Sequence, residues 1–236
     1  MKFISDDEVE NLHLPDPVKR YLTYTHVIGK EKIQTARLKQ RGFFRPTEDK
    51  KWMPFKAEEK YDIDDLSFSW YAKLKMAPLL RVHVIDEFIH GKGRVLVKAF
   101  NVIKIADEDG QKIDQGELLR FLSEIVWFPT FFVDKRLEWT PIDGYSAQVR
   151  LRHKNIIAAG TFFFNDEGEI TKFCAERYMT LYKKKHVLKN WSVTMEEYKE
   201  INGVLIPTKG SVSWDVKTGT FCYTTVEVDT CEYNKT

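Results

Sequence analysis

The sequence lacks the features that mark several large protein classes. None of its 236 residues fall in an apolar run near the length of about 18 that a membrane-spanning helix needs, so we expect no integral membrane insertion. Lys and Arg number 37 against 35 Asp and Glu, and this lack of a basic excess argues against a nucleic-acid partner. Asp6, Asp7 and Glu8 interrupt any apolar signal segment near the start, so we expect a cytoplasmic location.

Motifs for cofactors and metals are also missing. The sequence has neither the glycine pattern of a dinucleotide site nor that of a phosphate-binding loop. Its six histidines form no H-E-x-x-H motif, and Asp86 and His90 would lie about 13 Å apart on one strand, too far to hold one ion. The three cysteines form no C-x-x-C pair and are interpreted as reduced core residues. We therefore expect no cofactor and no metal site, and we assign no catalytic residue.

Aromatic residues and short alternating stretches are abundant. The chain has 16 Phe, 10 Tyr and 6 Trp, and period-two patterns separated by Pro, Gly and Asp predict strands. The first set is expected at residues 32–45, 56–61, 66–74, 81–90 and 94–105. The second set is expected at residues 147–152, 156–164, 169–179, 191–201, 204–209, 212–216 and 221–231. Asn202-Gly203 is the strongest hairpin signal.

Two helices interrupt this pattern. Pro17 at a first helical position predicts a helix over residues 17–27. Apolar residues at helical spacing predict a second helix over residues 117–128, with Asp114 as its capping residue. The order of elements predicts an α+β fold with a single antiparallel, strongly curved sheet, an unclosed half-barrel. The central helix would pack across the concave face, beside an N-terminal helix.

We expect a single domain over residues 1–236. It would comprise an N-terminal helical segment (1–30), a first set of strands (31–105), the central helix (114–133) and a second set of strands (137–233). No low-complexity linker or internal repeat divides the chain.

The candidate site lies on the polar side of the central helix. Glu117, Arg120 and Glu124 follow one another at helical spacing. They form either a solvated face of salt bridges or a stripe that points at a ligand. Large aromatic residues either fill a core or line an apolar cavity. The candidates for such a cavity wall are Trp70, Trp127 and Trp139.

Several sequence segments resemble motifs of a prokaryotic family of uncharacterised proteins. They include LPDPV at 14–18 with RYL at 20–22, QRGFFR at 40–45, WMPF at 52–55, QGELLRFL at 115–122 and WFPT at 127–130. Further matches are Trp139, Ile142-Asp143, Ser146-Ala147, Gly203, Ile206-Pro207 and Trp214. The family carries a domain of unknown function, so the resemblance implies no activity. The order of elements is also similar to the half-barrel of lipoprotein-carrier proteins, and this likeness implies a fold but no function.

The leading hypothesis is that the protein binds an apolar or amphipathic small molecule, such as a lipid, in the half-barrel. One alternative is a small-molecule enzyme that uses Glu117 or Glu124 as acid or base. Another is a protein–protein adaptor that uses an exposed sheet edge or aromatic patch. The lysines at 183–185 are typical of a solvated loop, with peripheral contact to an anionic membrane as the alternative. The sequence leaves the oligomeric state open.

Overall fold

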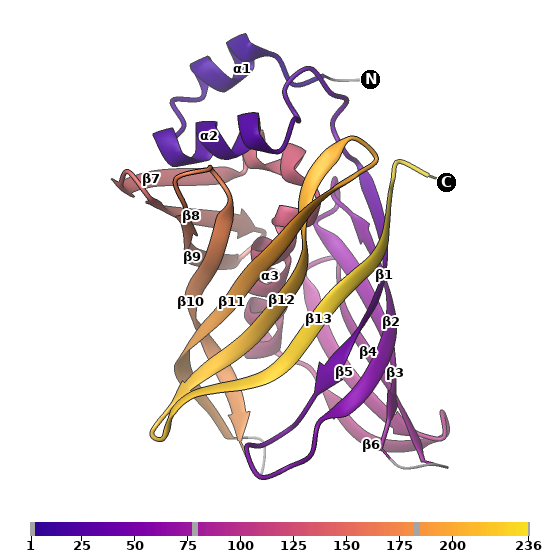
Figure 1. Ribbon diagram of the computed structural model, residues 1–236. Coiled ribbons are helices and arrows are strands. Elements are labelled where there is room, and N and C mark those ends of the chain that lie inside the picture. Colours follow the sequence, from indigo (N-terminus) through magenta and orange to yellow (C-terminus); the bar gives the residue numbers. More distant parts are fainter. Residues whose placement is uncertain (1–2, 77–79, 182–184, 236) are drawn as a thin grey trace.

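A computed structural model describes residues 3–76, 80–181 and 185–235. Within these residues, thirteen strands form one antiparallel sheet in the order β6-β5-β4-β3-β2-β1-β13-β12-β11-β10-β9-β8-β7. The sheet curls into a half-barrel around the central helix α3, Gln111–Glu124 (Figure 1). The predicted fold class is confirmed: a curled antiparallel sheet with a central helix and a short helical N-terminus.

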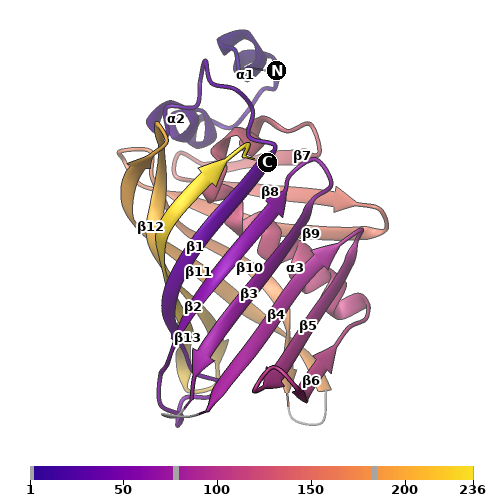
Figure 2. The ribbon, with the colours of Figure 1, turned by 90° about the vertical axis from the view of Figure 1, so that its right-hand side faces the viewer.

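The strands before α3 form one half of the sheet. They are β1 (Thr35–Phe44), β2 (Met53–Asp62), β3 (Ser67–Lys75), β4 (Arg81–Ile89), β5 (Lys92–Ala99) and β6 (Ile103–Glu108). Alternation of buried and exposed residues along β1 and β2 places one face toward the interior. Figure 2 shows these strands side by side, with α3 behind them.

The strands after α3 form the other half. They are β7 (Leu137–Asp143), β8 (Ser146–His153), β9 (Ile156–Phe164), β10 (Ile170–Leu181), β11 (Lys185–Ile201), β12 (Val204–Val216) and β13 (Gly219–Tyr233). The hairpin predicted at Asn202-Gly203 is confirmed, since both residues have a positive φ and Ile201 pairs with Val204. The two halves join where β1 pairs with β13.

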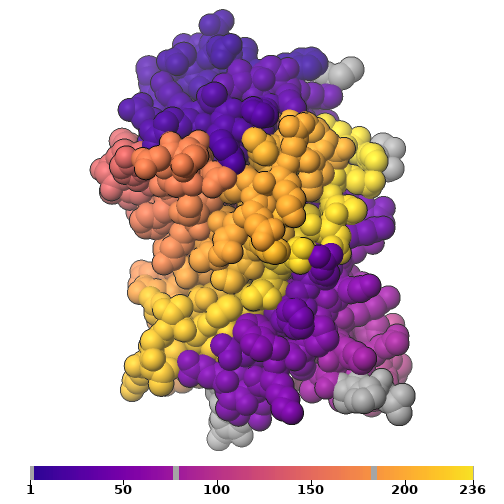
Figure 3. Space-filling view, viewed as in Figure 1, coloured from indigo at the N-terminus to yellow at the C-terminus, as the bar shows by residue number. Residues whose placement is uncertain are grey.

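The helical N-terminus closes one end of the half-barrel. It consists of α1 (Asp6–Asn11) and α2 (Asp16–Tyr24), which lie over that end in the space-filling view (Figure 3). Tyr21 is fully buried, packs on Phe132 with ring centroids 4.8 Å apart, and donates to the Val126 carbonyl at 3.3 Å. Burying a large apolar side chain stabilises a fold by roughly 2 kcal/mol, so contacts of this kind hold the helical N-terminus against the half-barrel.

Short 3-10 turns connect α3 to the second half of the sheet. They span Ile125–Trp127 and Pro129–Val133, and all of their residues are buried. With α2 and the inner faces of β8 and β9, they form the main hydrophobic core. A smaller apolar cluster on β2, β3 and β4 consists of Phe55, Ala57, Ala72, Leu74 and Val82.

Several predicted bounds were wrong. The strand expected at 94–105 is split into β5 and β6, because Phe100 and Asn101 take left-handed backbone conformations and reverse the chain. The stretches 204–209 and 212–216 belong to one strand, β12, which continues through Gly210. Among the described residues, no helix is long and apolar enough to cross a membrane.

The central helix also begins earlier than predicted. Its first residue is Gln111, so Asp114 lies within the first turn and does not cap it. The Asp114 carboxylate accepts instead from the Gly93 backbone N–H at 2.8 Å and from Lys92 Nζ at 3.1 Å. These bonds tie the start of α3 to the β4–β5 hairpin. The helix gives way to a 3-10 turn at Ile125, four residues before the helix-breaking Pro129.

Candidate functional site

A cavity of about 670 Å³ occupies the half-barrel beyond the main core. Its wall is largely apolar, and aromatic side chains come from both halves of the sheet, among them Phe44, Phe55, Trp70, Trp191 and Trp214. The cavity reaches the surface near Met76 and Ile105, which are 51% and 58% exposed. This mouth lies away from the end that α1 and α2 cover. The volume falls in the usual range of small-molecule sites, roughly 300–1,000 Å³.

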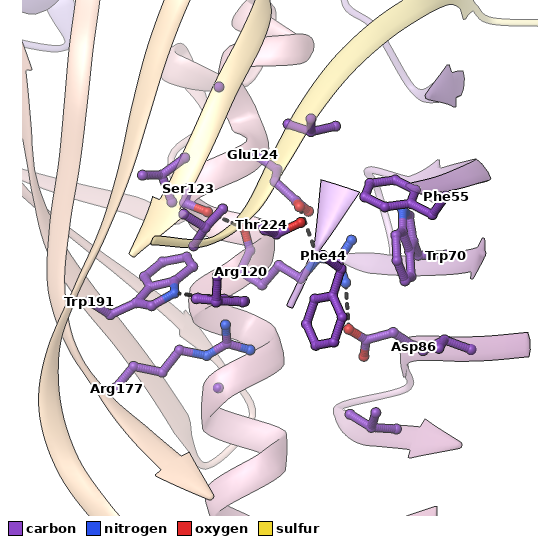
Figure 4. A pocket seen from close by; sticks show the side chains of 18 of the residues that line it. Phe44, Phe55, Trp70, Asp86, Arg120, Ser123, Glu124, Arg177, Trp191 and Thr224 are labelled. Carbon is purple, nitrogen blue, oxygen red and sulfur yellow. Dashed lines mark hydrogen bonds and ion pairs between the residues drawn. The ribbon is translucent and has the colours of Figure 1, made fainter. Parts of the chain in front are cut away.

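Charged side chains gather on the α3 side of this cavity. Arg120 lies between Asp86 and Glu124 in Figure 4, and it binds three carboxylates through different nitrogens. Its Nε bonds Glu124 at 2.9 Å, and its two terminal nitrogens bond Asp86 at 2.5 Å and Glu59 at 2.7 Å. Its guanidinium also lies over the rings of Phe68 and Trp70, at 4.9 and 5.2 Å. Arg120 thus joins α3 to β2 and β4.

A second layer of hydrogen bonds satisfies the outer oxygens of Glu59 and Glu124. The other Glu59 oxygen accepts from Gln40 Nε2 at 2.8 Å, and Gln40 Oε1 accepts from Trp70 Nε1 at 2.9 Å. The other Glu124 oxygen accepts from the Tyr61 hydroxyl at 2.9 Å. Buried hydrogen-bond networks of this kind fix the positions of their members.

Arg177 on β10 forms a second ion pair with α3. It bonds one oxygen of Glu117 at 2.9 Å and lies over the Trp191 ring at 4.9 Å. Two glycines make this approach possible. A Cβ on Gly116 would lie 3.2 Å from Arg177 Nε, and a Cβ on Gly93 would lie 3.0 Å from Glu117 Cγ. The wall around Glu117 is therefore closely fitted on both sides.

Burial changes the acidity of the carboxyl groups. Burial raises the pKa of Glu59 to about 8, and the neighbouring Glu124 carboxylate adds to the effect. Burial also raises the pKa of Glu117 to about 8, with a further contribution from Asp86. The pKa of Glu124 is raised by burial, against the opposing effect of Arg120. Both side chains therefore hold their protons to a higher pH than a free carboxyl group does.

The structure brings five of the six predicted site residues to the cavity. Trp70, Glu117, Arg120, Glu124 and Trp127 all line it. Glu117 is 3% exposed, so the reading of this polar side as a solvated face was wrong. Trp127 has a double role, because it is also part of the main core and donates to the Pro207 carbonyl at 3.1 Å.

The sixth predicted residue lies elsewhere. Trp139 on β7 is not among the cavity-lining residues. Its ring stacks on Phe132, with centroids 5.5 Å apart, and its Nε1 donates to the Phe132 carbonyl at 3.2 Å. Trp139 therefore belongs to the packing at the closed end of the half-barrel.

Sequence reasoning missed four polar members of the site: Gln40, Glu59, Asp86 and Arg177. Asp86 was considered only as a metal ligand. One signal was present, because Glu59 falls on the apolar side of an alternating strand, between Ala57 and Tyr61. A carboxylate at such a position requires a buried partner.

The other site predictions concern metal ligands and the lysine run. Across the described ranges, no group of three His, Cys, Asp or Glu side chains is arranged to hold a metal ion. The lysine run at 183–185 falls largely outside the described residues, which resume at Lys185, the first residue of β11.

The fold and the cavity define a half-barrel protein with an internal, largely apolar pocket. The chain belongs to a family of unknown function, DUF6544, whose model matches residues 3–226. The family resemblance in the sequence is thereby confirmed. No curated protein matches the sequence.

Solved structures with a similar fold include proteins from three bacteria. A domain from Vibrio parahaemolyticus, named for outer membrane lipoprotein sorting, has 7% identity and a TM-score of 0.45, covering 93% of this chain and 91% of that one. A DUF1329 family protein from Desulfovibrio piger has 10% identity and a TM-score of 0.46, covering 94% of each chain. A LolA superfamily protein from Nitrosomonas europaea has 8% identity and a TM-score of 0.40, covering 93% and 94%. The likeness concerns the fold alone.

Proposed function

We propose that this protein binds an apolar or amphipathic small molecule in the half-barrel cavity. The observation that carries the proposal is the cavity itself: about 670 Å³, walled by aromatic and aliphatic side chains, with its buried charges gathered along α3. Removing apolar surface from water contributes about 25 cal/mol per Å², so an apolar chain gains by entering such a space. The charged cluster would set the orientation of a polar end.

The test is a titration with N-phenyl-1-naphthylamine, a neutral apolar dye whose fluorescence rises in apolar surroundings. The matched pair of variants is Val212→Phe, which fills the cavity from β12, and Val102→Phe, which adds the same ring at a position 81% exposed. We expect the wild type to bind one equivalent of dye. Val212→Phe should weaken binding at least tenfold, and Val102→Phe should leave it unchanged.

Two results would contradict the proposal. One is a wild type that does not raise the dye's fluorescence. The other is an equal effect of the two variants, because binding would then not depend on the cavity. Thermal melts of both variants check that each is folded. Native mass spectrometry of the purified protein, followed by extraction, would identify any molecule that copurifies.

One observation favours a second candidate function. Glu117 is buried at the cavity wall and keeps its proton near neutral pH, as a general acid must. Buried ion-pair networks have the same effect on a carboxyl group, so this feature alone does not imply catalysis. The two functions differ in the outcome of Glu117→Gln. An enzyme would lose turnover with the cavity still able to bind the dye, whereas a binding protein would change only its ligand preference.

A further inference from the structure

The open end of the half-barrel exposes a group of apolar side chains. This end lies at the bottom of Figure 2, where β3, β4, β5 and β6 end or begin, opposite the end that α1 and α2 cover. Val102 is the most exposed large apolar residue in the described part of the chain, and Phe100 and Ile103 beside it are 56% and 62% exposed. Met76 and Ile105, at the cavity mouth, continue the group. We call these five residues the apolar rim.

The turn between β5 and β6 carries a phenylalanine at a position where the fold does not favour one. Phe100 and Asn101 are its central residues, with φ of 49° and 61°, and the Val102 N–H closes the turn on the Ala99 carbonyl at 3.0 Å. Asn and Gly adopt this backbone conformation with the least strain. The Phe100 ring is exposed and belongs to neither hydrophobic cluster. Packing within the protein therefore does not account for it.

A row of cationic side chains crosses the outer face of the sheet next to this rim. From β1 to β6, the residues that pair across neighbouring strands are Arg41, Lys56, Lys73, His83, Lys98 and Lys104. Lys75 and Arg81 form a second such pair nearer the rim. Like charges that face each other across strands destabilise a sheet. The row therefore favours a partner of opposite charge outside the chain.

Most of these cations have no partner within the protein. The two ends of the row are paired: Lys104 bonds Asp107 at 2.7 Å, and Arg41 bonds Glu227 at 2.5 Å. Among residues 3–76, 80–181 and 185–235, no carboxylate forms an ion pair with the cations between these ends or with the second pair, namely Lys56, Lys73, Lys75, Arg81 and Lys98. These side chains are available to an anionic surface.

The opposite end of the half-barrel begins with acidic residues. Residues 3–16, which include α1, contain no Lys or Arg and hold Asp6, Asp7, Glu8, Glu10 and Asp16. The small net charge of the whole chain thus hides an uneven distribution along the half-barrel. An anionic surface attracts the open end and repels α1, which orients the molecule before contact.

We propose that the open end docks on the surface of an anionic membrane. The apolar rim enters the headgroup region, and the cations around it face acidic headgroups. A nucleic acid would engage the cations but leave Phe100 and Val102 in water. A second copy of the chain would bring two rows of the same charge together, and Lys104 in the edge strand β6 further opposes such pairing. An anionic membrane is the partner that engages both features.

Docking in this orientation places the cavity mouth, at Met76 and Ile105, against the lipid. An amphiphile would then pass between bilayer and cavity without crossing water. This last step rests on the proposed function. The docking itself does not, because it requires only the outer surface of the protein.

The experiment measures cosedimentation of the whole protein with vesicles of phosphatidylcholine, either alone or with about 30% phosphatidylglycerol. It is carried out at about 0.1 M and 0.5 M NaCl, because salt screens the attraction of exposed charges. At the lower salt concentration, we expect the partition coefficient to be at least tenfold higher on the anionic vesicles. Most of this difference should disappear at the higher concentration.

The matched variants of the apolar rim are Phe100→Asn and Ile142→Asn. Ile142 is also 56% exposed but lies on β7, beside the end that α2 covers (Figure 1). We expect Phe100→Asn to lower partitioning onto anionic vesicles at least fivefold, and Ile142→Asn to leave it unchanged. The melting temperature of Phe100→Asn should not fall, because asparagine suits the positive φ. This separates docking from folding.

The matched variants of the cationic row are two double substitutions that change the net charge equally. Lys56→Gln with Lys73→Gln removes two neighbours in the row. Lys199→Gln with Lys235→Gln removes two lysines that are 59% and 66% exposed elsewhere. Each cation near an anionic surface strengthens binding roughly fivefold. We expect the first pair to lower partitioning at least tenfold on anionic vesicles only, and the second to have little effect.

Several results would overturn the docking proposal: no binding to the vesicles, equal binding to both compositions, or equal effects of the matched variants. Sedimentation velocity gives another. A wild-type dimer that Phe100→Asn dissociates would assign the rim to an interface between copies. The dye titration without vesicles tests the cavity separately. A protein that binds the dye but not the vesicles refutes docking alone, and one that binds the vesicles but not the dye refutes the proposed function alone.

Discussion

Replacing Arg120 by methionine tests whether the buried cluster is organised around one guanidinium. Methionine keeps an unbranched apolar side chain but removes the guanidinium that lies over Phe68 and Trp70, together with its bonds of 2.5, 2.7 and 2.9 Å to three carboxylates. One of these, Glu59, is fully buried. Removing one partner of a buried ion pair costs about 3–5 kcal/mol, because a charge is left without compensation. We expect a loss of this size in the free energy of unfolding at pH 8.

The loss should depend on pH in a defined direction. Without Arg120, the folded-state pKa of Glu59 and Glu124 rises further above the ordinary value of 4.5. A carboxyl with a raised folded pKa contributes most stability at low pH and loses it as pH rises through that pKa. The destabilisation should therefore be smaller at pH 5.5 than at pH 8, by at least about 1 kcal/mol.

The assay is urea unfolding followed by circular dichroism at both pH values, with linear extrapolation to water. The control is Arg37→Met, because Arg37 is half exposed and its pair with Glu58 at 2.8 Å lies on the surface. Such a pair contributes about 0–1 kcal/mol. A loss below about 1 kcal/mol for Arg120→Met at pH 8, or an equal loss at both pH values, would refute the reasoning.

Two further predictions concern the same region. Gly93→Ala should lower the free energy of unfolding by about 1–3 kcal/mol, because its Cβ would lie 3.0 Å from Glu117 Cγ and from the Ile113 backbone. The control is Gly144→Ala, which should have little effect because no atom lies within 4 Å of its Cβ. Equal melting temperatures for the two variants would contradict this prediction. The wild type should lose stability between pH 5 and about 8, because folded Glu59 and Glu117 stay protonated up to about 8 while the unfolded chain ionises near its ordinary 4.5. Glu117→Gln should flatten this profile in urea unfolding, and an unchanged slope would show that Glu117 titrates normally.

The sheet and the central helix could be predicted from the sequence because their signals are local. Alternation along β1 and the Asn202-Gly203 turn needed no knowledge of distant residues. The β5–β6 turn was missed because Phe100 and Asn101 reverse the chain without a glycine between them. Local pattern gives the type of an element more reliably than its ends.

The site could be predicted only in part, because half of it depends on pairing across the sheet. The spacing of Glu117, Arg120 and Glu124 on one helix was visible. Their partners, Glu59 on β2, Asp86 on β4 and Arg177 on β10, come together only through the curvature of the sheet. No sequence spacing could have placed them.

The pairing of β1 with β13 has a consequence for how the protein is made. These strands are the first and the last of the sheet in the chain, yet they lie side by side at its middle, where Ala36 pairs with Tyr233. Until β13 has been synthesised, β1 and β12 each present an open inner edge, and such edges invite pairing with other chains. Because contacts between distant residues also slow folding, we expect the growing chain to depend on chaperones until β13 joins its two halves. Only then does the cavity exist.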